Sequence, residues 1–171
     1  MTPRAVVLVE GASDAAAIET LARRGGRPVD GVAIVVLHGY TNLGSALRAL
    51  APAAPARVTV LCDAGAEAWV RRALGEDGRC RVCHTDLEDE LIRALGVERV
   101  REIVAGQGEL TGLQILERQP AHRDRSPAQH LHRFLGTRSG RKERYGALLA
   151  AALAPEAVPA PLRAVLDDLG L

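Results

Sequence analysis

The chain has 171 residues, of which 47% are hydrophobic and 25% charged, and its formal net charge is +1. This balance is typical of a globular protein, and a chain of this length buries enough surface to fold without disulfides or metal ions as supports. Disordered, fibrous and disulfide-scaffold classes are excluded, and no apolar run approaches the ~20 residues that a membrane-spanning helix needs. With three cysteines and no signal-peptide pattern, we expect a soluble cytoplasmic protein with reduced thiols and no membrane contact.

Charge is distributed unevenly along the chain. Residues 1–110 carry 13 arginines and 15 acidic residues, whereas residues 111–171 carry nine basic and six acidic residues. The stretch 111–145 alone has eight basic and three acidic side chains. An acidic front half followed by a basic segment suits a metal site beside a polyanion, although a solvated arginine face would give the same charges.

The first 95 residues alternate between short apolar runs and amphipathic segments. Runs of the kind buried in parallel sheets predict strands over 5–9, 32–37, 57–62 and 80–84. Apolar residues at helical spacing predict helices over 14–24, 43–50, 67–74 and 86–95. Ser13 is placed to cap the first of these helices. This alternation with short connections predicts an α/β fold, a parallel sheet with helices on both faces.

After residue 95 the strand signals fade. Ile103 to Ala105 is a candidate for one further strand. Beyond it, amphipathic spacing predicts only helices, around 131–135, 145–153 and 162–169. We therefore expect an α/β domain over 1–112 and a small basic helical appendage over 113–171, packed on it.

Acidic residues follow three of the predicted strands. Glu10 and Asp14 follow the first, Asp63 and Glu67 the third, and the acidic run 86–90 the fourth. Ligands of open parallel sheets bind at the carboxyl ends of the strands, where these groups converge. Crowded carboxylates repel one another unless a cation lies among them, and oxygen ligands favour Mg²⁺ or Mn²⁺. A single acidic residue at a helix start is usually a cap, but three clusters weaken that interpretation.

Four segments resemble the TOPRIM region of OLD-family endonucleases. The strand and helix start at 7–14, VLVEGASD, resembles the first TOPRIM motif, and 58–63, VTVLCD, resembles the second acidic motif. The segment 86–91, DLEDEL, resembles the acidic helix start of this group, and 140–145, GRKERY, is similar to its basic segment. The resemblance covers about residues 5 to 166 and implies a TOPRIM-like Rossmannoid fold, with the catalytic domain in 1–112.

The resemblance also implies roles for individual residues. One or two Mg²⁺ or Mn²⁺ ions would be bound by matching carboxylates: Glu10, Asp14, Asp63, Asp86 and Glu88. Glu10 would also act as general acid or base, and Lys142 would stabilise charge on the scissile phosphate.

The chain departs from the family pattern at two points. The usual second motif is Asp-x-Asp, and Gly65 stands where its second aspartate would be. Glu67 either replaces that aspartate as a metal ligand or is a surface residue. The chain also contains no Gly-x-x-x-x-Gly-Lys-Ser/Thr motif, so the ATPase half of OLD nucleases is missing. We expect either that the protein works alone or that a separate ATPase chain is its partner.

Nucleic acid, DNA rather than RNA, is the expected partner. Because aromatic residues make up only 2% of the chain, base stacking would be limited and phosphates would be held by arginines. The candidates that we retain for this contact are Arg133, Arg138, Arg141 and Arg144. His122, His130 and His132 lie in the same basic stretch, where exposed polar residues without a specific role are the better interpretation.

Two weaker patterns have simpler explanations. Cys80 to His84, CRVCH, matches the haem-attachment string, but it falls in a predicted buried strand and the chain shows no export signal, so we expect no haem. Zinc would need two further ligands nearby, and only His84 is close in sequence. The loop 39–42 either holds phosphate on its backbone amides or is an ordinary turn.

The leading interpretation is a metal-dependent endonuclease, a hydrolase that cleaves DNA phosphodiesters with a standalone OLD-like TOPRIM domain. The alternatives are a nucleic-acid-binding TOPRIM module without activity, because of Gly65, and a TOPRIM ribonuclease acting on structured RNA. A phospho-acceptor receiver domain would also place a carboxylate after its third strand. It needs a lysine after a later strand, however, and Lys142, the only lysine, lies in the helical tail.

Overall fold

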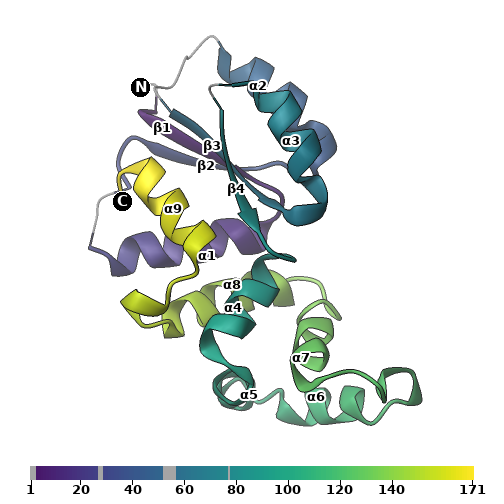
Figure 1. Ribbon diagram of the computed structural model, residues 1–171. Helices are drawn as coiled ribbons and strands as arrows, with labels where there is room; N and C mark the ends of the chain where they lie inside the picture. The colour runs from purple at the N-terminus through teal and green to yellow at the C-terminus, as the bar shows by residue number, and fades with distance from the viewer. Residues whose placement is uncertain (1–2, 27–28, 52–56, 77) are drawn as a thin grey trace.

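The structure is a computed structural model that describes residues 3–26, 29–51, 57–76 and 78–171. Its described strands form one parallel sheet in the order β2-β1-β3-β4 (Figure 1). The strand bounds are β1 Ala5–Val9, β2 Val32–Val36, β3 Arg57–Asp63 and β4 Arg79–Cys83. The predicted α/β class is confirmed, and each predicted strand is correct to within one residue at either end.

Helices cover both faces of the sheet. The helices beside the strands are α1 Ala12–Arg24, α2 Leu43–Leu50, α3 Glu67–Leu74 and α9 Ala160–Leu169. Val7 and Val9 of β1 are buried in one core with α1 and α9, whereas Val6 and Leu8 are buried in a second core with α2 and α3. Figure 1 shows these two helix pairs on opposite sides of the strands. The apolar run of β1 is therefore continuous because both of its faces are covered.

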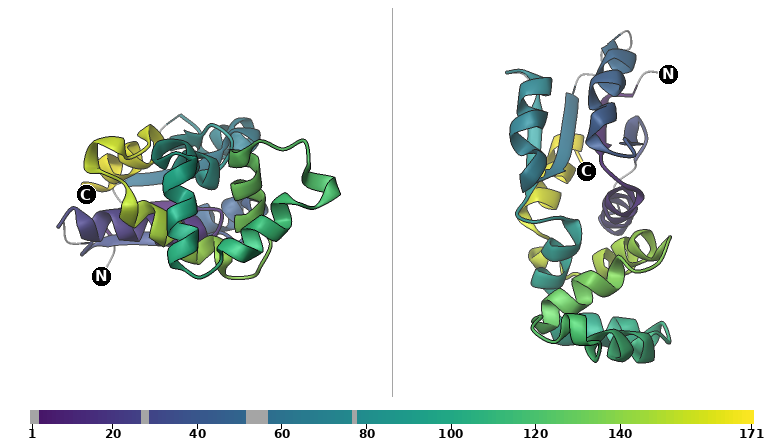
Figure 2. Two further views of the ribbon diagram at one scale, coloured as in Figure 1. Left: turned by 90° about the horizontal axis from the view of Figure 1, so that it is seen from below. Right: turned by 90° about the vertical axis from the view of Figure 1, so that its right-hand side faces the viewer.

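The remaining helices gather at the carboxyl ends of the strands (Figures 1 and 2). They are α4 Leu87–Leu95, α5 Val97–Gly106, α6 Leu110–Glu117, α7 Pro127–Leu135 and α8 Arg141–Ala152. Short 3₁₀ turns are η1 Tyr40–Asn42, η3 Ala64–Ala66, η4 Pro120–His122 and η5 Pro155–Ala157. Helix α8 lies against α1, so the C-terminal helices pack on the α/β part of the chain. Within the described residues, every helix is too short or too polar to cross a bilayer.

Two local predictions are corrected. The candidate strand at Ile103 to Ala105 is wrong, because these residues lie in α5, where Val100 and Val104 are buried one helical turn apart. Ser13 does not cap α1, which begins two residues earlier than expected and has Gly11 as its N-cap residue. The Asp14 carboxylate instead accepts a hydrogen bond from the Gly11 N–H at 2.9 Å.

The expected division into 1–112 and 113–171 falls inside α6. One continuous apolar core contains residues from both parts, for example Val7 of β1 and Leu149 of α8. The two-domain division stays a prediction.

Candidate metal centre

The gap between the carboxyl ends of β1 and β3 is the place where this sheet is expected to bind a ligand. The chain leaves β1 for β2 on one side and leaves β3 for β4 on the other, which makes this gap the topological switch point. Glu10 directly follows β1, and Asp63 is the last residue of β3. The register pairs Leu8 with Val60, so Glu10 and Asp63 emerge from neighbouring strands at nearly the same level.

The third acidic cluster enters from the start of α4. Asp86 is the N-cap of α4, and its Oδ1 accepts a hydrogen bond from the Asp89 N–H at 2.9 Å. Glu88 is only 4% exposed, and its Oε2 lies 3.1 Å from Nζ of Lys142 on α8. The Oδ2 of Asp86 lies 2.6 Å from Nε2 of His132 on α7. Helices α7 and α8 therefore contribute side chains to the same cluster as the sheet and α4.

The pKa values of two carboxylates reflect how closely the acidic groups lie. Burial, followed by the charges of Glu88, Asp63 and Glu10, raises the pKa of Asp14 to about 7. Burial, followed by Glu10, Asp86 and Glu88, raises the pKa of Asp63 to about 6. Asp14 and Asp63 thus each experience the negative charge of neighbouring carboxylates. A divalent cation among them would offset that repulsion.

Asp86 differs from its neighbours because it has cationic partners. Although burial opposes its ionisation, hydrogen bonds from His132 and from the Asp89 N–H hold the pKa of Asp86 below its ordinary value. The hydrogen bond to Asp86 in turn raises the pKa of His132. Burial opposes the charge of Lys142, but the charge and hydrogen bond of Glu88 raise its pKa overall.

The donor set fits a divalent cation. One carboxylate oxygen each of Asp86 and Glu88 and one ring nitrogen of His132 lie within 4.8 Å of one another. Within the described part of the chain, the buried Oε1 of Glu88 has no hydrogen-bond partner. A buried carboxylate oxygen normally has one, and a coordinated cation would take that place.

Glu67 lies outside this arrangement of contacts. Its carboxylate forms an ion pair with Arg71, one turn along α3, with an N–O distance of 2.8 Å and both side chains exposed. This contact favours the interpretation of Glu67 as a surface residue over its role as a substitute ligand. There is space for a side chain at Gly65, because a Cβ atom there would meet no heavy atom within 4 Å.

The arginines expected to hold phosphates fall into two groups. Arg133 and Arg138 are exposed and available to a ligand. Arg141 is 6% exposed, and its guanidinium donates to the Phe134 carbonyl at 3.0 Å and to Glu109 at 2.9 Å. Arg144 is more exposed but also pairs with Glu109. Arg141 therefore ties α8 to α7 and to the start of α6, and its burial does not support the expected phosphate contact.

The sequence interpretation missed two residues of the site. His132 was expected to be an exposed polar residue without a specific role. This prediction is wrong, because its ring contacts Asp86. The contact joins positions 46 residues apart, and nothing in the local pattern of α7 indicates it. Tyr40 lies in the loop expected to be a turn or a phosphate loop, and its hydroxyl accepts a hydrogen bond from the Asp63 N–H at 3.1 Å. Burial, and then the charge of Asp63, raises the pKa of Tyr40.

The Cys80 to His84 string does not form an exposed attachment site. Cys80 is buried in the core with α2 and α3, and Cys83 in the core with α1 and α9. The two thiols therefore face opposite sides of β4. The Sγ of Cys80 lies 3.4 Å from that of Cys62 on β3, and all three cysteines are free.

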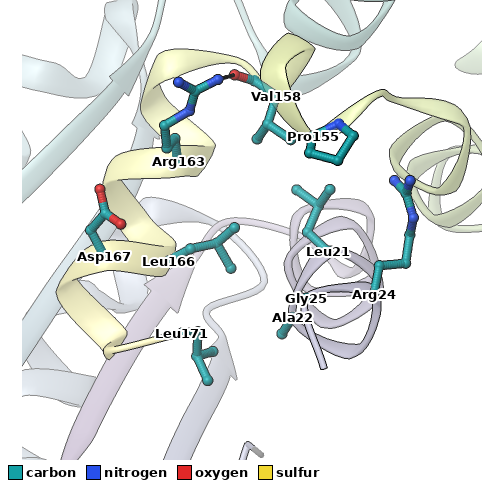
Figure 3. A pocket seen from close by; sticks show the side chains of 10 residues that line it. All are labelled: Leu21, Ala22, Arg24, Gly25, Pro155, Val158, Arg163, Leu166, Asp167 and Leu171. Carbon is teal, nitrogen blue, oxygen red and sulfur yellow. Dashed lines mark hydrogen bonds between the residues drawn. The ribbon is translucent and has the colours of Figure 1, made fainter. Parts of the chain in front are cut away.

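One hollow of the surface lies away from the acidic cluster. It has a volume of about 330 Å³ and lies between the C-terminal end of α1 and α9, with Leu21, Leu166 and Leu171 among its apolar lining and Arg24 and Arg163 at its rim (Figure 3). Asp14 stands at the other end of α1, roughly 15 Å away at 1.5 Å per helical residue. The hollow is therefore separate from the acidic cluster.

Comparison with known proteins identifies the fold. The chain matches no protein-family model and no curated protein sequence. Among solved structures, the C-terminal region of the Burkholderia pseudomallei OLD protein is 19% identical, with a TM-score of 0.69 over 99% of this chain and 98% of that one. The C-terminal region of the Xanthomonas campestris pv. campestris OLD protein is 22% identical, with a TM-score of 0.67 over 98% and 94% of the two chains. The resemblance found in the sequence thus extends to the fold of nearly the whole chain.

Proposed function

We propose that the chain, which has the fold of OLD C-terminal regions, is a TOPRIM-type nuclease that cleaves DNA phosphodiesters with Mg²⁺ or Mn²⁺. The observation that carries the proposal is the convergence of carboxylates from β1, α1, β3 and α4 beside the ammonium of Lys142. Their crowding at a topological switch point suits a cation and a ligand that approaches from outside the sheet.

Two groups of ligands support the proposal of up to two ions. Asp86 and Glu88 would hold one ion, and Glu10, Asp14 and Asp63 are placed to hold another. Bound divalent cations supply an activated water and neutralise charge on the leaving oxygen of a phosphodiester. Glu10 would hold or release a proton at the reacting oxygen, and Lys142 would contact the scissile phosphate. The exposed Arg133 and Arg138 would contact phosphates further along the nucleic acid.

The experiment is a plasmid-nicking assay with Mg²⁺ or Mn²⁺. We expect cleavage that stops in chelator and falls by about 100-fold or more in Glu10→Ala and in Asp63→Ala, in keeping with the usual size of a lost acid, base or ligand. Glu67→Ala is the matched control, since it also removes a carboxylate after β3 but one that pairs with Arg71. Cleavage that survives both site substitutions would contradict the proposal.

A binding module without activity is the second candidate, and it is favoured by Gly65, which stands where the second motif usually has an aspartate. It predicts DNA binding that persists in chelator and no nicking with any metal. Structured RNA cut under conditions that leave DNA intact would instead support a ribonuclease.

We also propose where the protein acts and with which partner. The protein would act in the cytoplasm, alone or with a separate ATPase chain. Nicking by the purified chain without nucleotide would support independent action.

A further inference from the structure

We propose that His132 is a nitrogen ligand of the cation bound by Asp86 and Glu88, and that it makes this site prefer Mn²⁺ over Mg²⁺. The inference rests on the proposed function, because it concerns the same metal centre. It differs from the expectation drawn from the sequence, in which only carboxylate oxygens bind the ions.

The geometry of the three side chains suits a shared ion. Ligand bonds of roughly 2.1 Å place neighbouring ligand atoms about 3 Å apart and opposite ones about 4.2 Å apart in octahedral coordination. All three candidate ligand atoms lie within 4.8 Å of one another. The 2.6 Å contact between Asp86 Oδ2 and His132 Nε2 is a hydrogen bond. An incoming ion would replace the proton of this bond, which would be released to solvent, and the two atoms would move apart to about 3 Å. The side chains come from two helices, α4 and α7, so their meeting is a product of the tertiary fold.

A second observation points to a ligand at the same place. The Oε1 of Glu88 is buried and has no hydrogen-bond partner among the described residues, although Oε2 of the same carboxylate contacts Lys142. Glu88 is 4% exposed, so bulk water does not easily supply the missing partner. An ion held between Glu88, Asp86 and His132 would satisfy this oxygen.

A ring nitrogen changes which metal the site selects. Mg²⁺ is hard and keeps to oxygen ligands, whereas imidazole suits first-row transition metals. A site completed by His132 would therefore favour Mn²⁺ over Mg²⁺ more strongly than an all-oxygen site would.

The test is pulsed electron paramagnetic resonance of the full chain loaded with MnCl₂, with histidine labelled with ¹⁴N or ¹⁵N. We expect a directly coordinated nitrogen coupling in the wild type that changes with the label and disappears in His132→Gln. Mn²⁺ affinity, measured by calorimetry, should fall about 10- to 100-fold in this variant, and Mg²⁺ affinity by much less.

His130→Gln is the matched control, because His130 lies on the same helix but its Nε2 contacts the His122 carbonyl at 2.8 Å. It should keep both the coupling and the affinity of the wild type. Bound Mn²⁺ without nitrogen coupling in the wild type would overturn the inference, and His132 would then only orient Asp86 through its hydrogen bond. That result leaves the proposed nuclease intact, since the plasmid assay with Glu10→Ala and Asp63→Ala decides it separately.

Discussion

At the scale of single residues, Gly65 is the position where the proposed metal site departs most clearly from the TOPRIM pattern. It is exposed in the turn η3, and a Cβ atom added there would meet no heavy atom within 4 Å. Its backbone also lies outside the left-handed region that would require glycine. The fold therefore leaves room for the aspartate that the second TOPRIM motif usually has.

We predict that Gly65→Asp raises affinity for Mn²⁺ about tenfold, because a further carboxylate adds charge and an oxygen ligand to the cluster. Its free energy of unfolding without metal should change by less than about 1 kcal/mol, as for most exposed substitutions. Calorimetric titration and urea unfolding provide the two measurements. Gly65→Asn introduces a side chain of the same shape as aspartate but without its charge, so its Mn²⁺ affinity should rise much less. An unchanged affinity in Gly65→Asp would show that this position faces away from the ions.

The sequence indicated most of the acidic residues of the cluster but few of the side chains that contact them. Glu10, Asp63 and Asp86 could be found because each follows a strand with an unmistakable apolar run. His132 could not, since its role depends on α7 meeting the start of α4. Arg141 was expected to bind phosphate because its charge was visible, whereas its burial against Phe134 and Glu109 was not.

At the scale of elements, α1 and α8 approach each other closely beside the acidic cluster. A Cβ atom at Gly146 of α8 would lie 2.6 Å from the Ser13 carbonyl oxygen of α1. The next residue in the chain is Asp14, which belongs to the acidic cluster. Packing between the two helices and the position of Asp14 are therefore linked.

Gly146→Ala should destabilise the protein by about 1–3 kcal/mol, the usual cost of overpacking, because backbone atoms rather than a flexible side chain obstruct the methyl group. It should also weaken Mn²⁺ binding by moving the start of α1. Thermal unfolding and calorimetry measure the two effects. Gly106→Ala, at the open end of α5, is the control and should be neutral or slightly stabilising. Equal behaviour of the two variants would refute the close approach.

Helix α9 contacts the sheet through a buried carboxylate in addition to its apolar side chains. Asp168 accepts two hydrogen bonds from Arg81 at 2.8 Å and one from the Thr59 hydroxyl at 3.2 Å. Burial opposes its charge, but the Arg81 hydrogen bonds hold the pKa of Asp168 below its ordinary value of 3.8. The ionised form therefore stabilises the fold.

Asp168→Asn should lower the free energy of unfolding by about 1–3 kcal/mol at pH 7, the usual range for hydrogen bonds to charged groups. Because the folded-state pKa is depressed, this contribution is fully present above the unfolded pKa near 3.8 and is lost as pH falls through the folded value. Urea unfolding of both proteins between pH 7 and pH 3 should show the difference shrinking with acid. A difference that stays constant over this range would mean that the charge of Asp168 contributes nothing.

The elements themselves were largely predictable, because buried strands and amphipathic helices leave clear periodic patterns. The candidate strand at Ile103 to Ala105 failed because three apolar residues do not distinguish a strand from one side of a helix. The packing of α8 against α1 could not be predicted from the sequence either. It depends on Gly146, whose small size is meaningful only once both helices are placed.

At the scale of the whole molecule, the proposed metal centre draws side chains from both halves of the chain. Glu10 and Asp63 come from the sheet, Asp86 and Glu88 from α4, and Lys142 from α8. The C-terminal helices that the sequence marked as an appendage thus supply groups to the site as well as packing against it (Figure 1).

The central claim is that these side chains form one pocket for divalent cations. A crystal soaked in MnCl₂ and measured for anomalous scattering tests it most directly. We predict one peak between Asp86, Glu88 and His132, and a second, weaker one beside Glu10, Asp14 and Asp63. Well-ordered crystals whose anomalous map is empty at the carboxyl ends of β1 and β3, or that bind manganese only elsewhere, would contradict the account.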